Sequence, residues 1–190
     1  MNRIVVGISG ASGAIYGVRL LEVLRGTAEV ETHLVMSSAA ELTIRYETGR
    51  DPAAVAALAD VVYGERDLAA SLASGTFLTA GMVVAPCSMR TLSGVANSAN
   101  DNLLVRAADV HLKERRRLVL VVRETPLHAG HLRLMSEATA AGAVILPPVP
   151  GFYQRPETVA DIVDHTVGKV LDVLGIHEHG LFRRWTGPED

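Results

Sequence analysis

The sequence predicts an α/β fold, a doubly wound parallel sheet of the flavodoxin-like or Rossmann-like kind. Short β-branched or apolar runs alternate with longer segments in which apolar residues recur every three or four positions. This is the pattern of strands that alternate with helices. At least five strands follow this order. Because no repeat, linker or low-complexity stretch divides the chain, we expect one domain over residues 1–190, with residues 176–190 as a C-terminal tail.

The first predicted strand and helix enclose a candidate ligand-binding turn. Ile4–Val6 is β-branched, a small-residue turn follows over residues 7–13, and a helical pattern begins at Ile15. The glycines allow a ligand near the backbone, Ser9 and Ser12 offer hydroxyls, and the helix start offers N–H groups to a phosphate. The turn lacks a Walker A lysine and fits the dinucleotide motif poorly. A mononucleotide such as FMN therefore fits better, and a tight turn without a ligand is the alternative.

The second predicted strand also ends in serine. Residues 32–36 form the strand, and Ser37 precedes a helix. Ser37 is either a ligand contact at the sheet edge or simply an N-cap. Glu47 lies at the end of that helix, where the helix dipole disfavours a carboxylate. We therefore treat it as a candidate functional residue. A short helix and a strand over residues 61–63 follow.

Another polar helix start follows the buried strand over residues 81–86. Ser88 and Thr91 place hydroxyls where backbone N–H groups can meet an anion. Cys87 is either a nucleophile or a buried core thiol, and the core thiol is favoured because no partner residue is evident.

The helix predicted over residues 102–113 has a charged side. Arg106, Asp109 and Lys113 lie three and four positions apart along it, and a solvated surface is the simplest reading of that spacing.

The strand over residues 118–122 leads directly into Arg123 and Glu124. A position directly after a buried parallel strand lies at the ligand-binding edge of the sheet. His128 and His131 begin the next helix. Their spacing fits a metal ion, but no third ligand accompanies them, so a metal site is disfavoured.

The last core strand, residues 143–146, is followed by a stiff loop. Three prolines over residues 147–150 hold it extended, and it presents two aromatic residues, among them Tyr153. A long amphipathic helix over residues 157–174 follows, and Lys169 projects from it.

The composition excludes several classes of protein. The chain has 190 residues, 48% of them hydrophobic, and a mean hydropathy of +0.24, which predicts apolar surface between subunits of a homo-oligomer. A net charge of −3 argues against nucleic-acid or membrane partners. The single cysteine excludes an internal disulfide. Without a signal peptide or a membrane-spanning run, a cytoplasmic enzyme is expected.

Six motifs in order resemble one family. They are Gly10–Ala14, Pro86–Leu92, Arg106–Val110, Leu112–Arg116, Arg123–Leu127 and Pro150–Tyr153. Together they resemble the UbiX flavin prenyltransferases, and the match covers nearly the whole chain. The resemblance implies an FMN-binding protein that assembles as a dodecamer. It also implies transfer of a dimethylallyl group from dimethylallyl monophosphate to N5 and C6 of reduced FMN. The implied partners are a flavin reductase that supplies reduced FMN and a UbiD-type decarboxylase that accepts the prenylated product.

The resemblance also implies roles for individual residues. The implied FMN contacts are Gly10, Ala11, Ser12, Ser37, Ser88, Met89, Arg90, Thr91 and Arg123. The implied catalytic residues are Glu124, Lys113 and Tyr153, and the implied prenyl phosphate site contains Tyr153, Lys169, Lys113, Arg106 and Glu47. The family often has arginine where this chain has Lys169, which keeps the charge and loses the bidentate fork. Some relatives have a tryptophan in the region of Leu68.

The implied reaction agrees with these residue types. Cationic side chains and a tyrosine hydroxyl can stabilise a departing monophosphate without a metal ion. Glu124 is the best candidate to move protons, and its alternative role is to orient Arg123 or Lys113. Asp161 and Asp164 imitate a metal-binding aspartate pair, but they lie within an amphipathic helix and read as its surface.

Two other functions stay open from the sequence. One is an FMN-dependent cysteine decarboxylase, although the histidine and asparagine motifs of the coenzyme A branch are missing. The other is a non-catalytic FMN-carrying accessory subunit of a decarboxylase, which would need no prenyl phosphate site. The sequence does not distinguish a monophosphate donor from a diphosphate donor.

Overall fold

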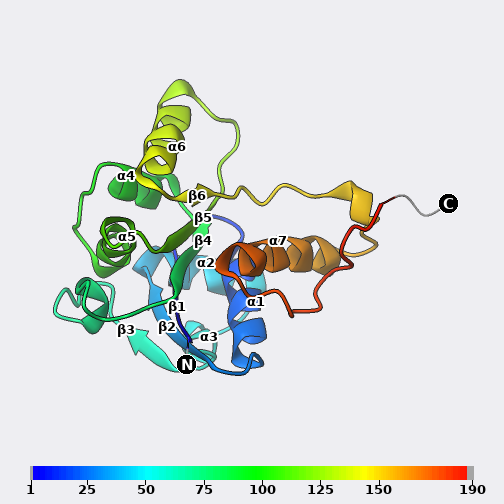
Figure 1. Cartoon of the computed structure of the whole chain (residues 1–190), viewed down its shortest axis with the longest axis horizontal. Coiled ribbons are helices and arrows are strands. Elements are labelled where there is room, and N and C mark those ends of the chain that lie inside the picture. Colours follow the sequence, from blue (N-terminus) through cyan, green and yellow to red (C-terminus); the bar gives the residue numbers. More distant parts are fainter. Residues whose placement is uncertain (1, 188–190) are drawn as a thin grey trace.

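The structure is a computed structural model that describes residues 2–187 (Figure 1). Within these residues, one six-stranded sheet has the order β3-β2-β1-β4-β5-β6, and every neighbouring pair is parallel. The strands are β1 (Asn2–Ile8), β2 (Val30–Met36), β3 (Val61–Tyr63), β4 (Gly81–Cys87), β5 (Arg117–Val122) and β6 (Val144–Ile145). The doubly wound parallel sheet is confirmed. The strand order reverses direction between β1 and β4, and ligands bind doubly wound folds at such a switch point.

Helices cover both faces of the sheet. They are α1 (Ala14–Arg25), α2 (Ser38–Thr48), α3 (Pro52–Ala56), α4 (Met89–Ala96), α5 (Leu103–Lys113), α6 (Ala129–Ala141) and α7 (Val159–Leu174), with the 3-10 turns η1 (Ser71–Ala73) and η2 (Phe152–Gln154). One buried cluster joins the sheet to α1, α2 and α7, and a second joins it to α4, α5 and α6. Figure 1 shows α1 and α7 on the opposite side of the sheet from α4 and α5.

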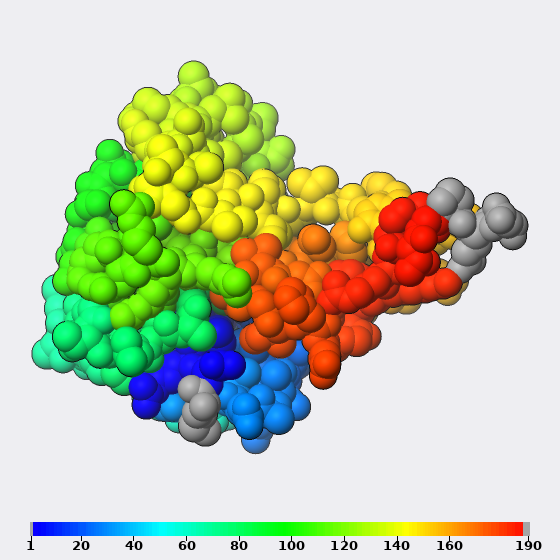
Figure 2. Space-filling view, in the orientation of Figure 1, coloured from blue at the N-terminus to red at the C-terminus, as the bar shows by residue number. Residues whose placement is uncertain are grey.

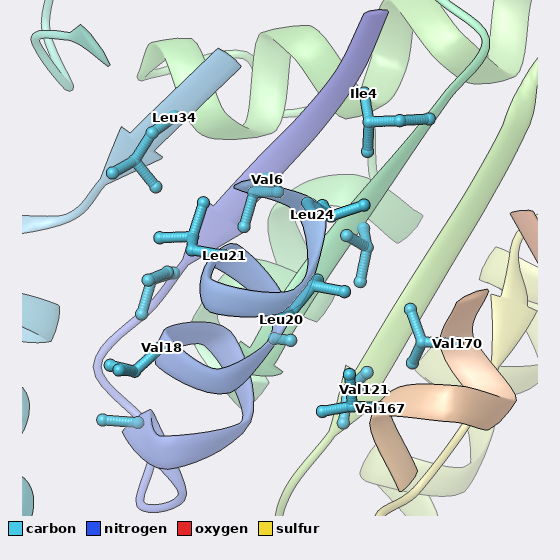
Figure 3. Close-up of a cluster of buried hydrophobic side chains, with 14 of the residues drawn as sticks. Ile4, Val6, Val18, Leu20, Leu21, Leu24, Leu34, Val121, Val167 and Val170 are labelled. Atoms are coloured by element: carbon cyan, nitrogen blue, oxygen red, sulfur yellow. The ribbon is translucent and has the colours of Figure 1, made fainter. Parts of the chain in front are cut away.

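The alternation of side chains in β1 explains why both faces are apolar. Ile4 and Val6 belong to the first cluster, and Val5 belongs to the second, because successive strand residues point to opposite faces. Figure 3 shows Leu21 and Leu24 of α1 against β1. All five side chains are almost fully buried, so the strand ends that carry the site stand on a packed core.

Helix caps set most of the helix starts. Ser37, Ser88 and Asn102 accept hydrogen bonds from the first turns of α2, α4 and α5. Helix α7 begins at Val159, two residues later than the pattern suggests, because Thr158 and Asp161 form a capping box. The carboxylate of Asp161 is therefore engaged at the helix start.

An extended segment projects from the body of the molecule. We call residues 147–158 and 176–187 together the arm, and Figure 2 shows its yellow and red parts projecting side by side. Among its aromatic side chains, Phe152 is 73% exposed, Tyr153 57% and Trp185 65%. No helix within residues 2–187 is long and apolar enough to cross a bilayer. The division into one domain and a tail stays a prediction.

Candidate active site

The carboxyl ends of β1 and β4 are joined by one serine. The Ser9 hydroxyl donates to the Pro86 carbonyl at 2.8 Å and accepts from the Ser88 backbone N–H at 2.8 Å. Ser9 is 1% exposed. Its hydroxyl therefore has a structural role at the switch point. It fixes the position of the turn after β1 relative to the turn after β4, and both turns carry predicted flavin contacts.

A cleft of about 460 Å³ opens at this edge of the sheet, a volume within the range of small-molecule sites. Five of the nine predicted flavin contacts line it: Gly10, Ser37, Ser88, Arg90 and Thr91. The other four are Ala11, Ser12, Met89 and Arg123. The cleft thus gathers predicted residues from the ends of β1, β2 and β4.

The cleft has a donor set that fits the phosphate of FMN. It contains the start of α4, where the first N–H groups lack partners within the helix, and the hydroxyls of Ser37, Ser88 and Thr91. At the start of α2, the Ser38 N–H donates to Glu65 and the Ala40 N–H donates to Ser37. Gly10 passes so close to α2 that a Cβ atom there would lie 2.4 Å from the Cβ of Ala39. A side chain at Gly10 would push the turn after β1 away from α2, so the geometry of this cleft requires glycine at that position.

The sequence reasoning missed the polar wall on the far side of the cleft. Glu65, Asn97 and Asp101 line it. The Glu65 carboxylate accepts from the Ser38 N–H at 3.0 Å, and Asp101 lies 3.7 Å from Arg90. The small polar run over residues 97–101 was the available signal for this wall. Nothing local in the sequence marks Glu65.

The Glu47 carboxylate lies at the unfavourable C-terminal end of α2, but it hydrogen-bonds to the start of α1. Its carboxylate accepts from the Gly13 and Ala14 N–H groups at 2.8 and 2.9 Å, at the start of α1. Partial burial raises its pKa, but hydrogen bonds from the Ser12 hydroxyl and from these two N–H groups outweigh burial and leave the pKa below its usual value. The structure thus corrects the expectation of a phosphate at the start of α1: a resident carboxylate takes those donors.

Arg123 lies near this carboxylate. Its positive charge lowers the pKa of Glu47, and it opposes the burial that raises the pKa of Tyr16 on α1. Glu124, the next residue, accepts from the Thr125 N–H at 2.9 Å and is exposed. The candidate proton carrier is therefore at the carboxyl edge of the sheet, as predicted, with its carboxylate open to a substrate.

Tyr153 and Lys169 lie where the arm meets α7. Tyr153 belongs to η2, and its hydroxyl is 3.2 Å from Nε2 of His165. Lys169 is exposed and lies one turn further along α7 than His165. Burial lowers the pKa of His165, and the positive charge of Lys169 lowers it further. The arm therefore brings the tyrosine toward the helix that carries the lysine.

Arg106 and Lys113 lie on α5 and have partners within the chain. Arg106 donates to the Ala73 carbonyl at 3.2 Å and to Asp109 at 2.9 Å. Lys113 ends α5 and pairs with Glu114 near the start of β5. The six residues of β5 span roughly 20 Å, so Lys113 and Glu124 stand at opposite edges of the sheet.

The remaining candidates have structural roles. Cys87 is fully buried, and burial raises the pKa of its thiol to about 12, which fits the core-thiol reading. His128 caps α6 by accepting from the Gly130 N–H, and its ring lies against that of His131, tilted by 32° with 3.6 Å between the ring centroids. Within residues 2–187, no group of three or more histidine, cysteine, aspartate or glutamate side chains is arranged to hold a metal ion.

Comparison with known proteins settles the family. The Flavoprotein family model matches residues 1–171. The flavin prenyltransferase UbiX of Escherichia coli strain K12 is 60% identical over 188 residues, with 98% of this chain and 100% of that protein covered. The chain belongs to the UbiX family of flavin prenyltransferases.

Solved UbiX structures share this fold along their whole length. AnUbiX, determined in complex with FMN and dimethylallyl pyrophosphate, has a TM-score of 0.96 and 53% identity, with 99% of each chain covered. A dodecameric FMN-dependent UbiX-like decarboxylase from Escherichia coli O157:H7 has a TM-score of 0.95 and 51% identity, with 97% of this chain and 100% of that chain covered. The fold and the family predicted from the sequence are both confirmed.

Proposed function

We propose that this UbiX family member transfers a dimethylallyl group from a prenyl phosphate to N5 and C6 of reduced FMN. One observation carries the proposal: a cleft with serine-capped helix starts lies at the switch point of a chain that is 60% identical to a flavin prenyltransferase along its whole length. The cysteine decarboxylase and the accessory subunit are the weaker alternatives.

FMN is a co-substrate in this proposal, and its reduced ring supplies the electron-rich nucleophile. Its phosphate would bind the hydroxyls of Ser37, Ser88 and Thr91 and the first N–H groups of α4, at the cleft. Arg123 would lie beside the flavin, close to the Glu47 carboxylate whose pKa it lowers. This placement follows from the donor set, because phosphate favours backbone N–H and hydroxyl donors at helix starts.

The prenyl phosphate would bind between Tyr153 and Lys169. As the bond between carbon and phosphate oxygen breaks, the phosphate takes the electron pair, and a lysine ammonium and a tyrosine O–H stabilise that charge. When the second bond forms, the central carbon of the prenyl alkene must gain a proton and C6 must lose one, and Glu124 is the proposed carrier of this proton. Its exposed position after β5 supports this role.

Lys113 and Arg106 would complete this site from a neighbouring subunit. Roughly 20 Å separates Lys113 from Glu124 within one chain, and a UbiX-like relative is dodecameric. A homo-oligomer of the same kind would let one subunit supply Glu124 and another supply Lys113. Mixing Lys113→Ala and Glu124→Ala proteins through dissociation and reassembly would restore part of the activity, whereas no restoration would place both residues in one subunit's site or outside it.

A product-mass experiment tests the proposed function. Purified protein is mixed anaerobically with reduced FMN and either dimethylallyl monophosphate or dimethylallyl diphosphate, and the flavin product is weighed by mass spectrometry. We expect prenylated FMN from the monophosphate. Unmodified FMN with both donors would refute the proposal, and product from the diphosphate alone would correct the donor. The UbiD-type acceptor, the flavin reductase and the cytoplasmic location stay predictions.

A further inference from the structure

His165 is one of five histidines that the sequence reasoning did not consider, and it contacts the proposed donor-binding tyrosine. Its Nε2 lies 3.2 Å from the Tyr153 hydroxyl, and the two rings meet edge to face at 83° with centroids 5.7 Å apart. The tyrosine is otherwise largely exposed on the arm. The contact with His165 therefore ties its hydroxyl to α7, the helix that carries Lys169.

The ring of His165 is itself held in place from two sides. A Cβ atom on Gly151 would lie 2.8 Å from Cε1 of His165, so the backbone of the arm packs against the ring. Phe182 of the tail makes an edge contact with the His165 ring, with the two ring centroids 5.1 Å apart. Phe182 fits there because Gly168 leaves room: a Cβ atom at Gly168 would be 2.4 Å from its ring.

The direction of the hydrogen bond decides what Tyr153 can do. A tyrosine hydroxyl has one proton, so if it donates to His165 it cannot donate to a phosphate oxygen. If His165 donates from Nε2, the tyrosine proton is free for the phosphate. Burial and the charge of Lys169 lower the pKa of His165, which favours the neutral ring. A neutral ring carries its proton on either nitrogen, and the tautomer with the proton on Nε2 is the one that donates to Tyr153.

We propose that His165 is a positioning residue for the prenyl donor: it donates from Nε2 to the Tyr153 oxygen and so turns the tyrosine proton toward the phosphate. The inference rests on the proposed function, because Tyr153 must face a prenyl phosphate. It adds to that function a residue that sets which way the tyrosine donates. His165 itself touches neither the donor nor the flavin in this account.

Two variants separate hydrogen bonding from ring packing. His165→Phe keeps an aromatic ring between Tyr153 and Phe182 and removes the donor atom. His165→Gln restores an N–H donor at a similar reach. A net hydrogen bond is worth a factor of roughly 2 to 13 in binding. We therefore expect His165→Phe to lower kcat/KM for dimethylallyl monophosphate by that factor, His165→Gln to recover most of it, and flavin titration to be unchanged in both.

A double-mutant cycle tests the route through Tyr153. In a Tyr153→Phe background, His165→Phe should have no further effect on kcat/KM, because no hydroxyl is left to orient. Arg133→Gln serves as the control, since it removes an exposed side chain of α6 that pairs with Glu137 at 2.7 Å and should leave kcat/KM unchanged. Additive losses in the cycle, or no recovery with glutamine, would overturn the positioning role. Failure of the wild-type protein to prenylate FMN would refute the proposed function instead.

Discussion

Removing the Glu47 carboxylate should destabilise the start of α1 by a measurable amount. The carboxylate accepts from two backbone N–H groups, of Gly13 and Ala14, at 2.8 and 2.9 Å, so it does the work of an N-cap, and Gly13 itself has no side chain for it. Loss of a helix cap costs about 0.5–2 kcal/mol. Because two N–H groups lose their partner, we expect Glu47→Ala to cost about 1.5 kcal/mol, which lowers Tm by roughly 3–6 °C in a chain of this length.

The pH dependence of this loss has a defined sign. The pKa of Glu47 is lower in the folded protein than its ordinary value of 4.5, so its contribution to stability is present above that value. The contribution is lost as the pH falls through the lowered folded pKa. The difference in unfolding free energy between the wild type and Glu47→Gln should therefore be largest near pH 7 and should shrink below about pH 4.5.

Chemical denaturation of apo protein at fixed subunit concentration, from pH 3 to pH 7, measures both effects. Glu137→Ala is a matched control, because that carboxylate pairs with Arg133 on the surface of α6 at 2.7 Å, and such pairs contribute about 0.2–0.5 kcal/mol. If Glu47→Ala costs no more than this control at pH 7, or if its cost grows toward low pH, the carboxylate is not the cap of α1.

Three further predictions concern the site. Lys169→Ala should raise the apparent KM for the prenyl donor about 10-fold or more, and Lys169→Arg should keep most of the activity. The FMN affinity measured by titration should not change in either variant. An unaltered KM for the donor in Lys169→Ala would mean that Lys169 is a surface lysine. Gly10→Ala should weaken FMN binding and cost about 1–3 kcal/mol in stability, because its Cβ would lie 2.4 Å from that of Ala39; unchanged titration and melting would contradict the packing at the cleft. Turnover should survive EDTA, because the proposed phosphate partners are cationic side chains and a hydroxyl, and a loss restored by magnesium would disprove this.

The strand ends were predictable because their signals are local. The alternation of apolar runs with serine and glycine at Ser37 and Ser88 reflects the sheet and its helix caps, and each of these serines is an N-cap in the structure. Glu47 was noticed for its unfavourable place on α2, yet its partner lies 33 residues away at Ala14. The sequence shows that a carboxylate at the end of α2 is unfavourable. The hydrogen bonds to α1 that offset this cost depend on how α1 and α2 pack, which the sequence does not show.

The charged side of α5 shows a second limit of the sequence. Arg106 and Lys113 share a helix with a predicted polar face, and within the chain they pair with Asp109 and Glu114. This is what a solvated surface would show. The periodicity cannot tell such a surface from one that faces another subunit, because both leave charges outside the core of the single chain. The length of β5 places Lys113 far from Glu124 within one chain, and the reassembly experiment tests whether Lys113 serves another subunit.

The two halves of the proposed site depend on different parts of the molecule. The flavin half stands on strand ends and helix caps above a buried core, and Ser9 joins the two central strands at 1% exposure. The donor half stands on the arm, where Arg184 pairs with Asp172 at 2.7 Å and Phe182 packs over Gly168. Sites on packed elements keep their geometry without a ligand, whereas segments with few buried contacts open at lower free energy. Order around Tyr153 therefore depends on the tail, and order in the flavin cleft does not.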